Sequence, residues 1–138
     1  MLLLTALMLK PTTFLNTKRP AAKNDLVSGG TVKRGELYRV YKPGGDPKQY
    51  RTFVIVSRQV LIDSQFSTVI CAPVFSHGEG LSTQVAVGPD EGLKYPSWIM
   101  CDNLVSLRKT DLTQFLGSIA KSRLGELDDA LKLALDLR

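Results

Sequence analysis

A charged loop rich in turn-forming residues separates two apolar segments of the chain. Residues 44–51 read GGDPKQYR and end in Arg51. A hairpin connection normally needs only about two to five residues, so the extra length favours a loop that binds something. Arg51 suits a phosphate group, because a guanidinium is planar, stays charged and donates two parallel hydrogen bonds. Asp46 and Lys48 lie in the same loop and are candidate binding residues, although an Asp beside glycines is also a common turn former.

A second group of reactive side chains follows the apolar segment 72–74. Ser76 offers a hydroxyl, and His77 is the only histidine in the chain, a residue type whose ordinary pKa lies near neutrality. Phe75 has two interpretations. It is either a core aromatic, which the apolar context favours, or a platform on which an unpaired base stacks. For Ser76 and His77 the plain alternatives are a strand-end hydroxyl and a turn residue beside Gly78.

Several kinds of catalytic site are missing from the sequence. It has no Ser/His/Asp spacing, no paired-carboxylate signature and no glycine-rich loop opening a helix, and its single His makes a zinc site improbable. We therefore expect neither a metal nor a cofactor. RNA cleavage by the substrate's own 2′-hydroxyl needs little apparatus, because the protein has only to place a proton acceptor, a proton donor and a cation beside one phosphate.

Positive charge is concentrated near the loop. Residues 33–58 hold seven basic and two acidic residues, whereas residues 59–138 hold seven basic and ten acidic ones. A basic surface of this kind attracts a nucleic-acid backbone, although a solvated face is the plainer explanation. The basic residues expected to form this surface are Lys33, Arg34, Arg39, Lys42, Lys48, Arg51 and Arg58.

Length and cysteine usage indicate one reduced, cytoplasmic domain. A chain of 138 residues buries enough apolar surface to fold without metals or disulfides. Cys71 and Cys101 lie singly in apolar runs, which predicts buried free thiols and fits the cytosol. Residues 1–31 are expected to be a flexible extension. Their apolar start, residues 1–9, is too short to cross a membrane.

The remaining chain predicts a mainly β fold. Tyr38 and Val40 should face one side of the first strand and Leu37 the other, and the run FVIVS (53–57) should be buried on both sides. A helix is expected from Ser122, as its N-cap, with Leu124, Leu127, Leu131 and Leu135 packed on the sheet. Short strands at this spacing suggest a small barrel or a coiled antiparallel sheet. The expected strands are 34–41, 52–57, 67–74, 83–87, 97–101 and 114–119, with turns at 77–80 and 88–92.

From residue 32 onward the sequence resembles the MazF/PemK family of toxin-antitoxin endoribonucleases. VKRGELYRV (32–40) resembles the family's opening strand, and GGDPKQYR resembles its Gly-Ser-Glu-Gln loop, which ends in Arg-Pro. FVIVS, APVFS (72–76), CDNL (101–104) and ALKLAL (130–135) resemble later blocks in the same order. No single block is specific, but the ordered set is.

The resemblance implies both a fold and a function. The fold is an SH3-like barrel with added helices. The resemblance also implies a homodimer whose groove binds single-stranded RNA, cleaves it within short sequence motifs without a metal, and is blocked by an acidic antitoxin segment. Position by position, Arg51 corresponds to the catalytic arginine and Asp46 to the acidic residue of the same loop.

Two departures from the family pattern concern the site. The family's catalytic Thr falls on Phe75, so we expect Ser76 to substitute for its hydroxyl if a bulge near Pro73 shifts the register. A basic residue often found after the Asp/Glu-Gln pair falls on Val105. One alternative is a module on the same fold that binds RNA or an antitoxin but no longer cleaves. Another is a poison of the related gyrase-binding type, which the loop Arg and the basic first hairpin count against.

Overall fold

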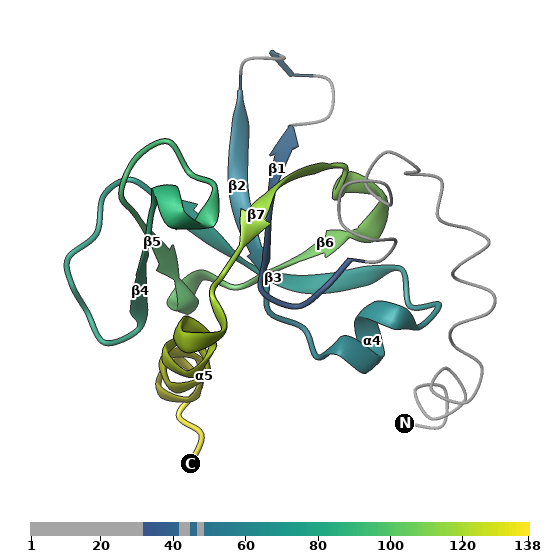
Figure 1. Ribbon diagram of the computed structural model, residues 1–138. Helices are drawn as coiled ribbons and strands as arrows, with labels where there is room; N and C mark the ends of the chain where they lie inside the picture. Colours follow the sequence, from purple (N-terminus) through teal and green to yellow (C-terminus); the bar gives the residue numbers. More distant parts are fainter. Residues whose placement is uncertain (1–31, 42–44, 47–48) are drawn as a thin grey trace.

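The described part of the chain is mainly β. The computed structural model describes residues 32–41, 45–46 and 49–138. Figure 1 labels its helices and strands, and those labels are kept below. The strands are β1 (Glu36–Tyr41), β2 (Tyr50–Ile55), β3 (Thr68–Phe75), β4 (Gln84–Val87), β5 (Ser97–Met100), β6 (Val105–Arg108) and β7 (Gln114–Ser118). The helices are α4 (Gln59–Asp63) and α5 (Lys121–Ala134), with 3-10 turns η1 (Pro89–Glu91), η2 (Cys101–Asn103) and η3 (Lys109–Asp111).

All seven strands belong to one curled antiparallel sheet. Its order is β4-β5-β3-β2-β1-β7, and β6 pairs with β3 off this path. Strand β3 is long enough to pair with β6 through its first half and with β5 through its last two residues. The β1–β2 hairpin rises at the top of Figure 1, away from α4 and α5. The expected coiled antiparallel sheet with a C-terminal helix is confirmed.

The sheet buries apolar side chains on both faces, in two separate clusters. Leu37 and Val54 are cross-strand partners and lie in the first cluster, with Leu127 and Ala130 of α5. Tyr38 packs in the second cluster, together with its neighbour Val40. The alternation predicted for the first strand is therefore confirmed. The run 53–57 is confirmed as buried on both sides, because Val54 and Val56 belong to the first cluster and Phe53 and Ile55 to the second.

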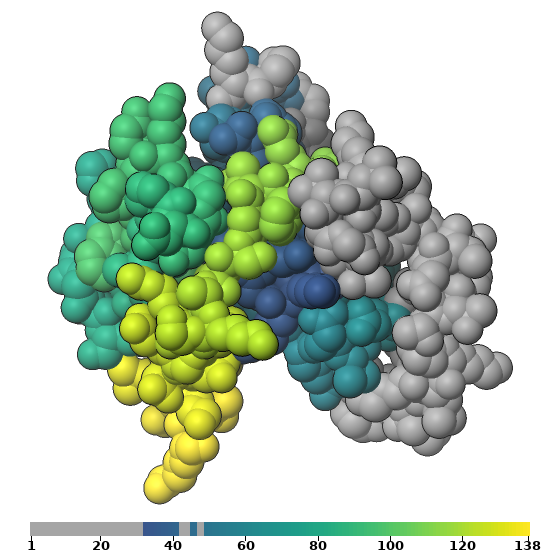
Figure 2. Space-filling model, viewed as in Figure 1, coloured from purple at the N-terminus to yellow at the C-terminus, as the bar shows by residue number. Residues whose placement is uncertain are grey.

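Helix α5 packs on the first cluster. On the surface in Figure 2, the yellow C-terminal segment lies beside blue atoms of residues 32–41. Leu127 of the helix is fully buried, and Leu124 and Leu131 pack against the same cluster. Leu135 lies at the C-cap and is 53% exposed, so the predicted leucine stripe ends one turn early. The prediction of Ser122 as N-cap is wrong, since the helix begins at Lys121 after Ala120, whose side chain has no capping oxygen.

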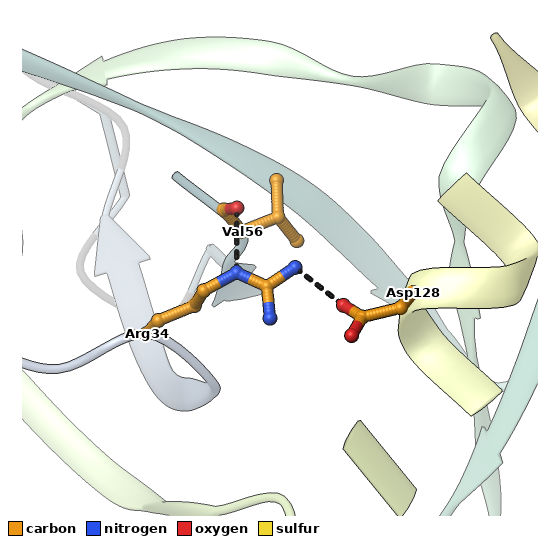
Figure 3. A network of polar contacts seen from close by, with 3 residues as sticks. All are labelled: Arg34, Val56 and Asp128. Atoms are coloured by element: carbon orange, nitrogen blue, oxygen red, sulfur yellow. Dashed lines mark hydrogen bonds and ion pairs between the residues drawn. The ribbon is translucent and has the colours of Figure 1, made fainter. Parts of the chain in front are cut away.

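Arg34 ties this helix to the sheet. Its Nε donates a hydrogen bond to the Val56 carbonyl at 3.0 Å, and its Nη2 lies 2.9 Å from Asp128 Oδ1 (Figure 3). One guanidinium therefore joins the segment before β1, the end of β2 and α5. This corrects the expectation that Arg34 belongs to a free anion-attracting surface.

Two glycines let β7 cross η1 at van der Waals distance. Gly92 has φ +95°, and a Cβ there would lie 2.2 Å from the Leu116 carbonyl oxygen. A Cβ on Gly117 would lie 2.2 Å from the Glu91 carbonyl oxygen. Only residues without a Cβ fit this crossing without a backbone shift.

Both cysteines are buried and free, as predicted. Burial raises the pKa of the Cys71 thiol to about 12. Burial and the neighbouring Asp102 carboxylate raise the pKa of Cys101 to about 11. These thiols are therefore packing residues and not nucleophiles at neutral pH.

Other expectations needed correction. Strand β6 and helix α4 were missed, and residues 101–103 form a 3-10 turn where the last strand residue was expected. The expected extension, residues 1–31, lies outside the described residues. None of the helices in the described part has the length and apolar character needed to span a bilayer.

Candidate active site

Arg51 is an exposed cation at the loop end of the β1–β2 hairpin. It is the second residue of β2, directly opposite Val40 of β1. Val40 shares its face with Tyr38, so Arg51 lies on the face of the second cluster, just beyond the point where that cluster ends. The strand thus presents the guanidinium next to a buried core while leaving it open to solvent.

Phe75 faces Arg51 across the β2–β3 ladder. The ladder pairs Ile55 with Cys71 through to Thr52 with Val74 without a register shift, so Arg51 and Phe75 come next in line. The Arg51 guanidinium carbon lies 5.2 Å from the Phe75 ring centroid, within the range of a cation–π contact. Phe75 is only partly buried and belongs to neither apolar cluster. The interpretation of Phe75 as a core aromatic is therefore wrong.

Trp98 continues the same line on the next strand. It is the direct partner of Phe75 in the β3–β5 ladder, whereas its neighbour Ile99 points into the first cluster. Arg51, Phe75 and Trp98 thus lie side by side on three adjacent strands, which are about 4.8 Å apart. We call these three residues, one arginine and two aromatic residues, the aromatic row. Trp98 was not singled out from the sequence.

The loop between β3 and β4 packs on the row. A Cβ on Gly78 would lie 2.2 Å from Trp98 Cδ1 and 2.3 Å from Cγ, so the Gly78 backbone lies directly against the indole. The Gln84 side-chain oxygen accepts hydrogen bonds from the backbone N–H groups of Glu79 and Gly80 at 2.9 and 3.1 Å. Gly80 takes a left-handed φ of +73° within this loop. Residues 77–80, where a turn was predicted, form an irregular loop that Gln84 holds, and the assigned turn follows at residues 82–83.

Ser76 and His77 begin this loop and are both exposed. Strand β3 ends at Phe75 and the chain bends at Ser76, so the strict alternation of strand side chains ends there. The described β2–β3 ladder contains no bulge, and the expected register shift near Pro73 is therefore wrong. Ser76 is adjacent in sequence to the residue that faces Arg51, while Phe75 itself occupies the position opposite Arg51.

The remaining candidates lie at different places. Asp46 is exposed in the hairpin loop, where its carbonyl accepts a hydrogen bond from the Gln49 N–H at 2.8 Å. Lys48 lies outside the described residues. Arg58 is exposed at the N-cap of α4, beyond the opposite end of β2 from Arg51. Six residues of mostly extended chain lie between the two arginines, a span of roughly 20 Å, so Arg58 does not share a phosphate with Arg51.

The basic residues that were expected to form one surface therefore lie at separate places in the fold. Lys33 and Arg58 lie near the base of the hairpin, and Arg34 is engaged by Asp128. Arg39 points to the opposite face from Arg51, where its guanidinium carbon lies 4.2 Å from the Tyr50 ring centroid. Within the described residues, Arg51 is the cation in contact with Phe75, which is the cross-strand partner of Trp98.

This arrangement fits an anion that carries an aromatic ring. A guanidinium that rests on one ring keeps its outer N–H groups for phosphate oxygens. The neighbouring hydroxyl and imidazole of Ser76 and His77 supply groups that can exchange protons. No cluster of three metal-ligating side chains occurs among the residues that the structure describes.

Comparison with known proteins identifies the family of the chain. Residues 33–135 match the family model described as PemK-like, MazF-like toxin of type II toxin-antitoxin system. The chain is similar to endoribonuclease MazF3 of Mycobacterium tuberculosis, with 32% identity over 87 residues that cover 63% of this chain and 84% of MazF3.

Solved structures show the same fold. The Mycobacterium tuberculosis toxin MazF-mt6 is 27% identical, and the alignment covers 75% of this chain and 98% of that one with a TM-score of 0.65. A mycobacterial endoribonuclease in complex with its cognate antitoxin is 24% identical over 78% of this chain and 97% of that one, with a TM-score of 0.66. The MazF of a Deinococcus radiodurans MazE-MazF complex reaches a TM-score of 0.63 at 18% identity, covering 78% of this chain and 98% of that one. By its family match and its MazF3 relative, the chain belongs to the PemK-like, MazF-like toxins of type II toxin-antitoxin systems.

Proposed function

We propose that this chain is a metal-independent endoribonuclease that cleaves single-stranded RNA at selected sequences. The observation that carries the proposal is the exposed Arg51 at the loop end of the β1–β2 hairpin, with its guanidinium carbon 5.2 Å from the centroid of the Phe75 ring. Its similarity to MazF3, which is named an endoribonuclease, supports the same reaction class.

The reaction needs no bound cofactor because RNA supplies the nucleophile. The 2′-oxygen forms a bond to phosphorus while the bond from phosphorus to the 5′-oxygen breaks. The 2′-hydroxyl gives up its proton and the leaving 5′-oxygen gains one, so the products are a 2′,3′-cyclic phosphate and a 5′-hydroxyl. Negative charge builds on the phosphate oxygens in the transition state, where a fixed cation stabilises it most.

Arg51 is the phosphate clamp in this scheme. Its contact with Phe75 restricts the side chain before RNA arrives, so less conformational entropy is lost on binding. Ser76 is proposed to contact the scissile group with its hydroxyl, since the chain bends there and leaves the side chain exposed. His77 and Asp46 are proposed to contact RNA at the edges of the site. Lys48 and Arg58 are proposed to attract the RNA backbone at a longer range.

The proposed partners follow from the family. One mycobacterial neighbour is described as an endoribonuclease in complex with its cognate antitoxin, and one Deinococcus radiodurans neighbour as a MazE-MazF structure. We propose an acidic antitoxin for this chain as well. We also propose that the protein is a cytoplasmic homodimer. The hairpin loop and the aromatic row are the surface that such an antitoxin would have to cover to block RNA.

A binding module without cleavage is the second candidate, because Phe75 occupies the position opposite Arg51 where the resemblance implies a hydroxyl. Incubation of the protein with a long single-stranded RNA in EDTA separates the two. Discrete cuts with 5′-hydroxyl ends and cyclic phosphates are expected. Intact RNA that is nevertheless bound would favour the binding module instead.

A further inference from the structure

We propose that Phe75 and Trp98 form a stacking platform for an unpaired RNA base next to the phosphate held by Arg51. The inference rests on the proposed function and names how its site recognises a single strand. It assigns to Trp98 a substrate-positioning role, on the evidence of where the residue lies in the sheet.

Packing against the core does not account for these two rings. Both are partly buried, and neither belongs to the two apolar clusters of the described sheet. Their neighbours along each strand, Val74 and Ile99, point into the first cluster and already supply that packing. Phe75 and Trp98 therefore place two large aromatic residues at paired positions of adjacent strands, on a face that also carries an exposed cation.

The order of the row matches the order of groups in a nucleotide chain. Arg51 binds the charged backbone at one end, and Phe75 and Trp98 extend away from it across two strands. Stacking suits any base, because every base has a π-face. A paired base has that face covered by its neighbours, so the platform discriminates against duplex RNA without reading sequence.

Trp98 is also held in a fixed orientation. The Gly78 backbone lies against the five-membered part of the indole, and Gln84 fixes the loop that carries Gly78. A ring that is already immobilised loses little rotamer freedom when a base stacks on it. The same contact couples the platform to Ser76 and His77, which lie in the loop that starts two residues earlier.

The test uses the fact that Trp98 is the only tryptophan in the chain. The probe is a single-stranded oligoribonucleotide with 2′-O-methyl groups, which binds but has no nucleophile for cleavage. Binding is followed by the anisotropy of a labelled end and by the intrinsic fluorescence of Trp98. A duplex of the same sequence is the matched control. We expect quenching by the single strand and little by the duplex.

Variants supply the second readout. Phe75→Leu and Trp98→Leu are expected to weaken binding of the single strand by roughly tenfold or more, the usual scale of one lost base–aromatic stack. Tyr95→Leu is the control, because Tyr95 is an aromatic that is 62% exposed and lies outside the row. Circular dichroism and thermal melting of each variant establish that it is folded.

The outcomes separate this inference from the proposed function. Tight binding without a change in Trp98 fluorescence, and with unchanged affinity in Phe75→Leu, would overturn the platform and leave the ribonuclease intact. Equal quenching by duplex and single strand would also overturn it. No binding of single-stranded RNA at all would overturn the proposed function and the platform with it.

Discussion

The guanidinium of Arg51 rests 5.2 Å from the ring centroid of Phe75, its neighbour on the adjacent strand. The contact exists because β2 and β3 pair in unbroken register up to Thr52 and Val74, which leaves these two side chains together just beyond the last described pair. An aromatic ring in this position holds the arginine but supplies no hydroxyl. We therefore propose that the chemistry draws on the loop that follows Phe75, where Ser76 and His77 lie.

Gly78→Ala should impair cleavage by displacing that loop. The new Cβ would overlap the Trp98 ring at 2.2 Å, so either the indole or the loop has to move. A shift of about 1 Å in a catalytic group can lower a rate by about 10²-fold, and we expect a loss of kcat/KM approaching that size. Initial cleavage rates measured beside thermal melting check this.

Gly125→Ala is the control for that substitution, because a Cβ there meets nothing within 4 Å. It should leave cleavage unchanged. A Gly78→Ala protein that cleaves at the wild-type rate would show that the loop position is irrelevant to the chemistry.

Gly92→Ala and Gly117→Ala should each destabilise the fold. Their Cβ atoms would lie 2.2 Å from backbone carbonyl oxygens, which cannot swing away as a side-chain end can. Overpacking costs about 1–3 kcal/mol, and Gly92 also has φ +95°, which an alanine tolerates poorly. Urea denaturation should therefore show losses of about 1–3 kcal/mol for Gly117→Ala and about 2–5 kcal/mol for Gly92→Ala. In contrast, Gly125→Ala in the middle of α5 should gain up to about 1 kcal/mol. Equal stabilities for all three variants would contradict the close crossing of β7 and η1 at Gly92 and Gly117.

Arg34→Ala should cost more stability than Asp128→Ala. Arg34 bonds both Asp128 and the Val56 carbonyl, whereas Asp128 is half exposed and contributes through the ion pair. An exposed pair is worth about 0.2–1 kcal/mol, and the loss of the second hydrogen bond adds about 1 kcal/mol. A double-mutant cycle measures the pair alone, and its coupling energy should fall with added salt. A salt-independent coupling, or a larger effect of Asp128→Ala, would contradict this assignment.

The buried thiols should make stability fall at alkaline pH. In the unfolded chain a thiol ionises near its ordinary pKa of 9.0, but burial raises the pKa of Cys71 to about 12 in the folded protein. Above pH 9 the unfolded state therefore binds fewer protons than the folded state, and ionisation favours unfolding. The contribution is complete below pH 9 and is lost as the pH rises towards 12.

Cys71→Ala isolates this effect from other groups that titrate at high pH. Denaturation midpoints at pH 8 and pH 10 should differ less in Cys71→Ala than in the wild type. Alkylation of the native protein at pH 8 should be slow and should become fast in urea. An identical pH dependence in both proteins would show that the Cys71 thiol does not contribute.

Local sequence patterns were enough to predict much of the fold. Alternation in residues 37–40 assigned both faces of β1 correctly, because side-chain direction in a strand follows a period of two. The run 53–57 was recognised as buried on both sides because residues 53–56 are continuously apolar, which puts apolar side chains on both faces of a strand. Strand β6 was missed because VSLR is short and largely exposed, so it carries little apolar signal. Helix α4 has only five residues and no capping side chain.

The sequence predicted only part of the site. Arg51 stood out because its loop is longer than a turn requires, but the partner of Arg51 is set by pairing between strands. Phe75 and Trp98 are 23 positions apart in the chain and become neighbours through the β3–β5 register, which no local pattern reports. Likewise, the Gly78 contact with Trp98 depends on how a loop folds over a distant strand.

Cleavage of single-stranded RNA in EDTA by the wild type, Arg51→Ala and Arg58→Ala tests the central claim most directly. Arg58 is the matched control, since it is an exposed arginine at the far end of β2. We expect discrete cuts with 5′-hydroxyl ends, a loss of about 10²–10³-fold in Arg51→Ala, as for removal of one group that stabilises transition-state charge, and a much smaller loss in Arg58→Ala. Cleavage by a folded Arg51→Ala protein at the wild-type rate would contradict the account.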